Sequence, residues 1–407
     1  SPPPHLHPSR RDVDALLAPL LAQKSKKVER HQRTYALYEA VTETILSEHA
    51  SRSPSTYFSA TMVFLDALAA KASPEPMSVY GALRILSLIL AHVPQQLLAK
   101  RADDSLKLIG AMMAMPAVAK DVAFLRAGIT CLAAILESVP RSAYRAPNSV
   151  ASSALDGLIS LVLHEKPKVR KQAAEGVRLV LGIAKNSRVS EKTAKFARKA
   201  VASFALATFA ASDESGIDKG AAAKIVSQQL HALGFLRTVI HAIEGKSLFK
   251  VLSALFSRLA GAAKARSAGS SAVYSAAQLA HLRLHLVRLL VGLTSHIDAF
   301  GAAFADTPEQ LESFVDSLTS IIPPQGSATA SALAMDVGAS AKAASSIAST
   351  TGIDVEVEIA YVKVMRNALF VLGLVNTAAA GDRVPAFVSR CIDLLSHDSR
   401  QLAQAAL

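Results

Sequence analysis

The sequence contains no tryptophan, and aromatic residues make up only 5% of its 407 positions. Runs of valine, isoleucine, threonine and tyrosine, which favour β-strands, are also scarce. Hydrophobic residues nevertheless make up 51% of the chain, and the helix-forming residues alanine and leucine are abundant. The composition therefore argues against a large β-sheet and predicts an all-α fold.

Cysteine is nearly absent as well. Cys131 and Cys391 lie far apart, each inside an apolar helical pattern. Two such residues form neither a disulfide framework nor a metal-binding pattern. We expect both to be buried thiols in a reducing compartment.

The motifs that carry most enzyme chemistry are missing too. The chain has no glycine-rich nucleotide loop, no metal-ligand cluster and no nucleophile elbow, so we predict no enzyme activity, no cofactor and no metal site. His281 and His285 lie one helical turn apart, but no third ligand is close in sequence, which favours a solvated helix face.

No apolar run reaches the roughly 18 residues that a membrane span requires. The nearest, Val79–Val93, is interrupted by Arg84. The chain starts with serine and no secretory segment follows, so we expect a fragment or a processed chain.

The stretch Ser149–Lys185 reads as a helix, a turn and a second helix. Apolar residues recur every three or four positions in both halves, and Pro167 lies where a helix tolerates proline, in the first turn. The apolar positions are Ala151, Leu155, Leu158 and Val162, then Val169, Ala173, Val177, Val180, Leu181 and Ala184. Neither helix is long enough to be stable alone, so each needs a neighbour.

The second half of this stretch resembles a HEAT repeat, in which a proline and Val-Arg open the second helix. Here the segment Pro167–Ala174 reads PKVRKQAA, and His164 replaces the aspartate that is usual in the turn. In the family that aspartate supports a ladder of hydrogen bonds with arginines of neighbouring repeats, and we assign Arg170 an inter-repeat structural role. The resemblance implies a right-handed α-solenoid of HEAT- or armadillo-like repeats of about 40 residues.

Breaks in this helical pattern divide the chain into four parts. Residues 1–10 are proline-rich and expected to be flexible, and residues 11–322 form the HEAT-like solenoid. Residues 323–353 are rich in alanine and serine, which predicts an insertion or linker. Residues 354–407 resume the repeats and stop in mid-repeat.

Basic residues concentrate in one region. The formal net charge is +12, and residues 164–199 contain eleven lysines and arginines against three glutamates. Lys171, Arg178 and Lys185 recur every seven residues, which predicts one helix face, and Lys192, Lys195 and Lys199 form a similar row on the next helix. We expect the two rows to run side by side and to contact phosphates. The candidate binding residues are Lys168, Lys171, Arg178, Lys185, Arg188, Lys192, Lys195 and Lys199.

The ordered series of motifs resembles the N-terminal part of the ribosomal-RNA-processing protein 12 family. It runs through His31-Gln32, Val41-Thr42-Glu43, Tyr57-Phe58, Ser78-Val79-Tyr80 and His92-Val93-Pro94 to Glu165–Lys171, and weakens after Ala205. The resemblance implies a non-catalytic scaffold in the nucleolus or nucleus. Such a scaffold binds pre-ribosomal RNA and assembly factors within the small-subunit precursor (the SSU processome) and aids subunit export.

Two alternatives stay open. An importin-like nuclear transport receptor, or another HEAT-repeat adaptor, has the same repeat pattern, although transport receptors tend to be acidic and this chain is basic. The basic cluster can also be a solvated face without a partner. No aromatic residue interleaves with the basic ones on their exposed face, so base-specific readout is not predicted.

Overall fold

The computed structural model describes residues 10–321 except 23–27, 72, 146–148, 211–218, 244, 268–275, 296–299 and 302–307, and parts of 360–391. Every regular element in these ranges is helical, which confirms the all-α prediction. The chain divides into two compact units, Ser1–Ala200 and Val201–Leu407. The predicted segments 1–10 and 323–353 lie almost entirely outside the described residues.

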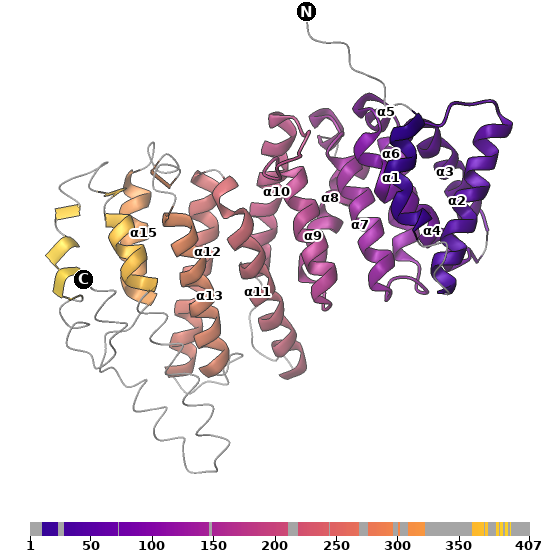
Figure 1. Cartoon of the computed structure of the whole chain (residues 1–407). Helices are drawn as coiled ribbons and strands as arrows, with labels where there is room; N and C mark the ends of the chain where they lie inside the picture. The colour runs from indigo at the N-terminus through magenta and orange to yellow at the C-terminus, as the bar shows by residue number, and fades with distance from the viewer. Residues whose placement is uncertain are drawn as a thin grey trace, which may run out of the picture. The chain divides into compact units, whose positions relative to one another are not determined.

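Unit 1 contains nine complete α-helices and three short 3-10 helices among its described residues (Figure 1). The α-helices are α1 (Arg10–Leu21), α2 (Glu29–Ser47), α3 (Pro54–Ala69), α4 (Pro76–Ile89), α5 (Gln95–Lys100), α6 (Ala102–Ala114), α7 (Val122–Leu136), α8 (Val150–Ser160) and α9 (Pro167–Val180). The 3-10 helices are η1 (Leu90–His92), η2 (Arg141–Tyr144) and η3 (Leu161–Leu163). Helix α10 (Glu191–Ala210) continues from unit 1 into unit 2.

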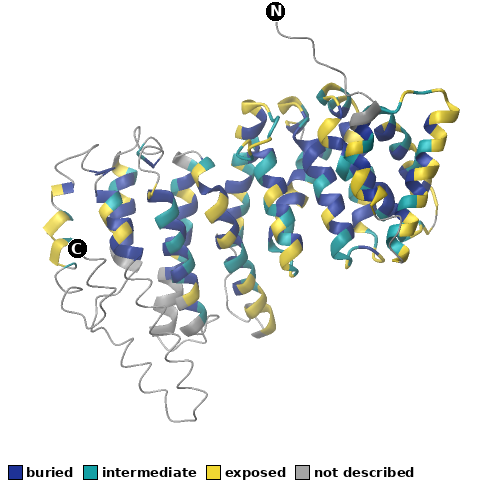
Figure 2. Cartoon of the chain, in the orientation of Figure 1, coloured by how far each residue is buried: buried dark blue, intermediate teal, exposed yellow. Residues whose placement is uncertain are grey.

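The helices of unit 1 stack in two layers. Helices α2, α4, α7 and α9 contact one another in succession and form the first layer, while α3, α6 and α8 form the second. Each helix also packs against its sequence neighbour in the other layer, so every apolar stripe is covered from two sides. This alternation is the arrangement that the helix–turn–helix pattern predicted, and Figure 2 shows the resulting change between buried and exposed positions along the helices.

Short-range signals explain where these helices begin. Ser53 caps α3 in a reciprocal pair with Thr56, and Ser149 caps α8 through the amide of Ser152. Helix α7 begins at Val122, although apolar residues start at Ala117. The reason is that the Asp121 carboxylate accepts hydrogen bonds from the amides of Ala123 and Phe124.

The prediction that α9 extends to Lys185 is wrong. Gly182 has a φ of +76°, and its N–H donates to the carbonyl of Leu179 while the N–H of Ile183 donates to Arg178. This pair of bonds is a Schellman motif, which ends a helix at a residue that tolerates the left-handed region. Lys185 therefore lies in the connection to α10 and not on the polar face of α9.

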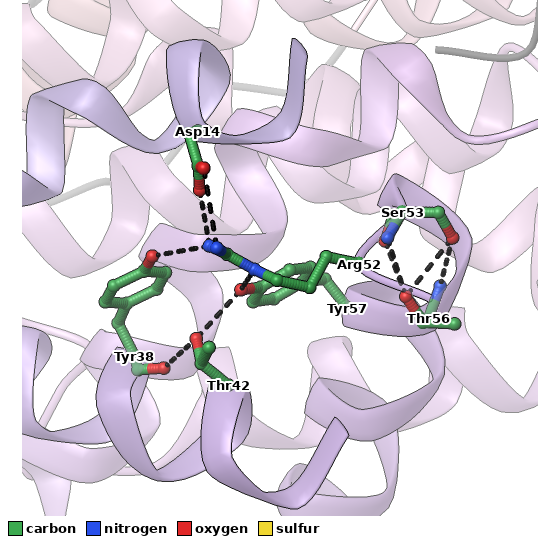
Figure 3. A network of polar contacts seen from close by, with 7 residues as sticks. All are labelled: Asp14, Tyr38, Thr42, Arg52, Ser53, Thr56 and Tyr57. Atoms are coloured by element: carbon green, nitrogen blue, oxygen red, sulfur yellow. Dashed lines mark hydrogen bonds and ion pairs between the residues drawn. The ribbon is translucent and has the colours of Figure 1, made fainter. Parts of the chain in front are cut away.

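A polar network joins α1 to the next two helices (Figure 3). The Arg52 guanidinium forms an ion pair with Asp14 and donates to the hydroxyl groups of Tyr38, at 3.0 Å, and Tyr57, at 3.2 Å. The Tyr57 hydroxyl also lies 2.8 Å from that of Thr42. Burial is the largest cause of the raised pKa of Tyr38. The network satisfies buried polar groups where the first helix meets the stack.

Unit 2 repeats the two-layer pairing. Its helices are α11 (Lys219–Val239), η4 (Ile240–Ala242), α12 (Gly245–Ser267), α13 (Ala276–Thr294) and α15 (Pro308–Ile321). Helix α11 packs on α13, and α12 packs on both α13 and α15. Residues 360–369 are helical, whereas most of the repeat predicted for residues 354–407 lies outside the described ranges.

Candidate nucleic-acid interface

Helix α9 separates its apolar and basic residues cleanly. Val169, Ala173 and Val177 are fully buried against the stack, whereas Lys168 and Lys171 point outward and are exposed. Arg178 shares the outward face but forms an ion pair with Glu175 at 3.2 Å, which offsets its charge. Lys168 and Lys171 have no acidic partner among the described residues, so they remain available to an external anion.

Arg188 has a structural role instead of an exposed one. The carboxylate of Glu137, whose side chain is only 3% exposed, accepts a hydrogen bond from the Arg188 backbone and lies 3.6 Å from its guanidinium. The same guanidinium donates to the carbonyl of Val93, and Gln95 donates to the Arg188 carbonyl. Arg188 thus fastens the connection after α9 to the ends of earlier repeats, and we remove it from the candidate contacts.

Arg170 also differs from its predicted role. Its guanidinium donates to the carbonyls of His164 and Glu165 at 2.8 Å each, so these contacts stay within its own repeat. Nδ1 of His164 accepts from the amide of Lys166 at 3.1 Å. Burial is the largest cause of the lowered pKa of His164, to which the adjacent charges of Lys166 and Arg170 add. The hydrogen bonds of this turn therefore stay within residues 164–170, whereas the family pattern suggested a ladder of hydrogen bonds between neighbouring repeats.

Two basic residues that sequence spacing did not single out, Lys120 and Arg126, lie beside α9. Lys166 donates to the carbonyl of Lys120 at 2.5 Å, and Arg126 on α7 donates to Gln172 on α9 at 3.4 Å. Both contacts join residues 46 positions apart in the chain. We call the resulting group, Lys120, Arg126, Lys166, Lys168 and Lys171, the α7–α9 patch. In the sequence, only the repeat of the apolar pattern at about 40 residues could have predicted that these positions lie close together.

Helix α10 carries the second group. Thr193, Ala194 and Ala197 are buried, whereas the opposite face exposes Lys192, Lys195 and Lys199, which we call the α10 row. Arg198 forms an ion pair with Glu191 at 2.7 Å, which offsets its charge. Three lysines at spacings of three and four residues present a line of positive charge along about two turns of helix.

Other kinds of site find no support in the described ranges. No three His, Cys, Asp or Glu side chains gather there closely enough to hold a metal ion. None of the described helices is both long and apolar enough to cross a membrane. Cys131 is fully buried, and its thiol donates to the carbonyl of Leu83 at 3.4 Å, while Cys391 is only half-buried. Burial raises the pKa of the Cys131 thiol, so the group is chemically inert.

Alternating helices in two layers, with no strand among the described residues, define an α-solenoid of HEAT-type repeats. Comparison with known families gives the same class, because the family described as "RRP12-like, N-terminal HEAT repeats" matches residues 8–264. The match covers more than half of the chain and extends well beyond Ala205. The chain belongs to this family, which confirms the resemblance found in its motifs.

Curated relatives agree with that assignment. The RRP12-like proteins of Gallus gallus and Homo sapiens are 33% and 34% identical to the chain over 151 residues. This stretch is 37% of the chain and 11% of each relative, so the chain matches a small part of their length.

Two crystal structures of engineered proteins align with much of the chain. The first covers 76% of this chain and 97% of its own, at 14% identity and a TM-score of 0.31. The second covers 85% and 97%, at 15% identity and a TM-score of 0.27. These scores are too low to support any argument.

Proposed function

We propose that this chain is a non-catalytic HEAT-repeat scaffold of ribosome biogenesis. In this proposal it acts in the nucleolus and nucleus, binds pre-ribosomal RNA and assembly factors within the small-subunit precursor, and aids subunit export. Membership of the RRP12-like family supports the scaffold role, and the basic surfaces of unit 1 support contact with RNA.

The observation that carries the RNA proposal is the exposed, unbalanced charge on two successive helices. Lys168 and Lys171 on α9, and Lys192 and Lys199 on α10, are exposed and have no ion pair with any described acidic residue. Lysines held on rigid helices bind phosphates as point charges and release condensed counterions from the RNA. Lys185 and Lys195 add exposed charge at the same end of unit 1.

Such a surface reads charge and not sequence. Lysine donates to phosphate from any direction, and it has no planar group that could pair with the edge of a base. The expected binding is therefore tolerant of sequence and strongly dependent on salt, as suits a scaffold that follows an RNA backbone.

A charge-reversal series tests the proposal. We expect Lys192→Glu combined with Lys195→Glu and Lys199→Glu to weaken RNA binding without loss of helicity, because all three side chains point away from the core. Each phosphate contact that is lost should flatten the slope of log affinity against log salt by roughly 0.7 to 0.9. The measurements are RNA affinity across a salt series and far-ultraviolet circular dichroism.

The matched control reverses three exposed lysines elsewhere in unit 1, namely Lys71, Lys100 and Lys107. It changes the net charge by the same amount and should leave most of the affinity intact. Equal affinities and equal slopes for the parent chain and the α10 variant would show that the basic cluster is a solvated face without an RNA partner.

The transport-receptor alternative needs a different measurement. Sedimentation of the tagged full-length protein from cell extract separates the two functions, because a scaffold of the small-subunit precursor migrates with large particles. Migration only with soluble transport complexes would contradict the ribosome-assembly function.

A further inference from the structure

We propose that the α7–α9 patch and the α10 row bind two separate RNA segments at the same time, so that the chain bridges them. This proposal rests on the proposed function, since both surfaces are taken to bind phosphate. It departs from the expectation that the two rows run side by side as one track.

The first step of the proposal concerns the layer of the stack in which α10 lies. Its N-terminal turn lies at the edge where α7 and α9 end, because Thr193 donates to the carbonyl of Val139 and Arg198 to that of Leu181, at 3.3 Å each. Helix α10 therefore runs back antiparallel to α9, as α8 does after α7. The rings of Phe196 and Tyr144 lie 4.9 Å apart, and Tyr144 belongs to η2, which contacts α8. Helix α10 thus continues the layer of α8.

Helices of different layers expose opposite sides of the stack. In α9 the buried residues Val169 and Val177 face the core, so Lys168 and Lys171 point out of the first layer. In α10 the buried residues Thr193 and Ala197 face the core, so the α10 row points out of the second layer. With roughly 10 Å between packed helix axes and a helix radius of about 5 Å on each side, the two outer surfaces lie about 20 Å apart.

The edge between the two surfaces does not form a continuous basic track. Lys185 is exposed there, but the charge of Arg188 is balanced by Glu137 and that of Arg198 by Glu191. A short RNA that follows one surface therefore meets neutral ion pairs before it reaches the other. Two short RNAs, in contrast, can each occupy one surface without sharing a contact.

Both surfaces have enough charge to bind RNA separately. The α7–α9 patch combines five cations from two repeats. The α10 row has three lysines on one rigid helix. When one chain binds two segments of a single RNA, the second contact becomes intramolecular, and affinity rises without any new contact.

The probe is oligouridylate of about four nucleotides, which is at the short end of single-strand site sizes and is too short to hold both surfaces at full contact. Two measurements are made with the full chain: the number of oligonucleotides bound per chain at saturation, and the capture of a labelled oligonucleotide on beads that carry an unlabelled one. The patch variant combines Lys120→Glu, Lys168→Glu and Lys171→Glu, and the row variant combines Lys192→Glu, Lys195→Glu and Lys199→Glu. The control reverses Lys71, Lys100 and Lys107.

We expect two oligonucleotides per chain and bead capture for the parent chain and the control. Each triple variant should bind one and lose capture. One oligonucleotide per parent chain, or loss of all binding in either triple variant, would mean a single site and overturn the proposal while leaving RNA binding intact. No binding by the parent chain would overturn the proposed RNA contact as well. If a glutamate variant loses helicity, the matching lysine-to-glutamine variant takes its place under the same criteria.

Discussion

The carboxylate of Glu137 is almost completely buried, and it is bonded to both the backbone and the guanidinium of Arg188. A buried carboxylate without a partner is costly, so Arg188 stabilises the fold by pairing with Glu137. Lys185 lies only three positions earlier and is exposed. At the scale of single residues, the local partner therefore decides whether a positive charge is structural or available for binding.

Replacing Arg188 by glutamine should lower the free energy of unfolding by about 1 to 3 kcal/mol, because Glu137 loses its charged partner in a buried position. RNA affinity and its salt slope should stay near those of the parent chain. Urea unfolding and RNA titration measure the two effects, with Lys185→Gln as the exposed control. A lower salt slope at unchanged stability would make Arg188 an RNA contact after all.

At the scale of helices, the ends are fixed by caps and the sides by packing. Helix α7 illustrates both, since Asp121 caps its N-terminus and also forms an ion pair with Arg30 of α2. Burial alone would raise the pKa of Asp121. The amides of Phe124 and Ala123 and the charge of Arg30 outweigh that effect and lower it.

The lowered pKa gives Asp121 a pH-dependent effect on stability. Its contribution should be fully present above the ordinary aspartate pKa, near 3.8, and lost as the pH falls through the lower folded-state value. Asp121→Asn should therefore cost about 1 kcal/mol at neutral pH, with the difference shrinking in acid. Urea unfolding at neutral and acidic pH compares the two proteins, and a difference that does not change with pH would contradict the charge-based account.

Packing of α9 gives a second prediction at this scale. Val169 is fully buried, so Val169→Asp should place an unpaired carboxylate in the core at a cost of several kcal/mol. Because each repeat is held by its neighbours, adjacent helices should unfold as well. The control is Lys171→Asp, which makes the same residue on the exposed face. Helicity and melting that remain unchanged in Val169→Asp would count against a stacked solenoid.

At the scale of the whole molecule, the chain forms two units, each with its own core. The paired helices of unit 1 are covered mainly by neighbours from unit 1. Both proposed RNA surfaces also lie in unit 1, before Ala200.

A fragment of residues 1–210, which ends with α10, should therefore fold alone and retain most of the RNA affinity of the full chain. Circular dichroism, thermal melting and RNA titration of the fragment check this. A fragment that is unfolded would show that unit 1 depends on contacts with unit 2. A folded fragment that does not bind RNA would move the interface elsewhere.

The helical class, most helix positions and the separation of apolar from charged faces follow from the amino-acid sequence alone. These properties depend on residues three or four positions apart, so local periodicity, prolines and caps such as Ser53 and Ser149 are enough to predict them. The same local pattern was misleading where a single backbone angle mattered. The positive φ of Gly182 ends α9 and removes Lys185 from the helix.

Which charges share a surface depends on how the helices pack. Lys120 and Arg126 join the patch on α9 through contacts 46 residues apart, and Arg188 leaves the candidate set because it is paired with Glu137, 51 residues away. In the proposed bridging arrangement, the α9 and α10 rows also lie on opposite sides of the stack, whereas their spacing had suggested parallel neighbours. The physical reason is that a solenoid brings residues together at the period of its repeat, whereas charge patterns along the sequence report only on one helix at a time.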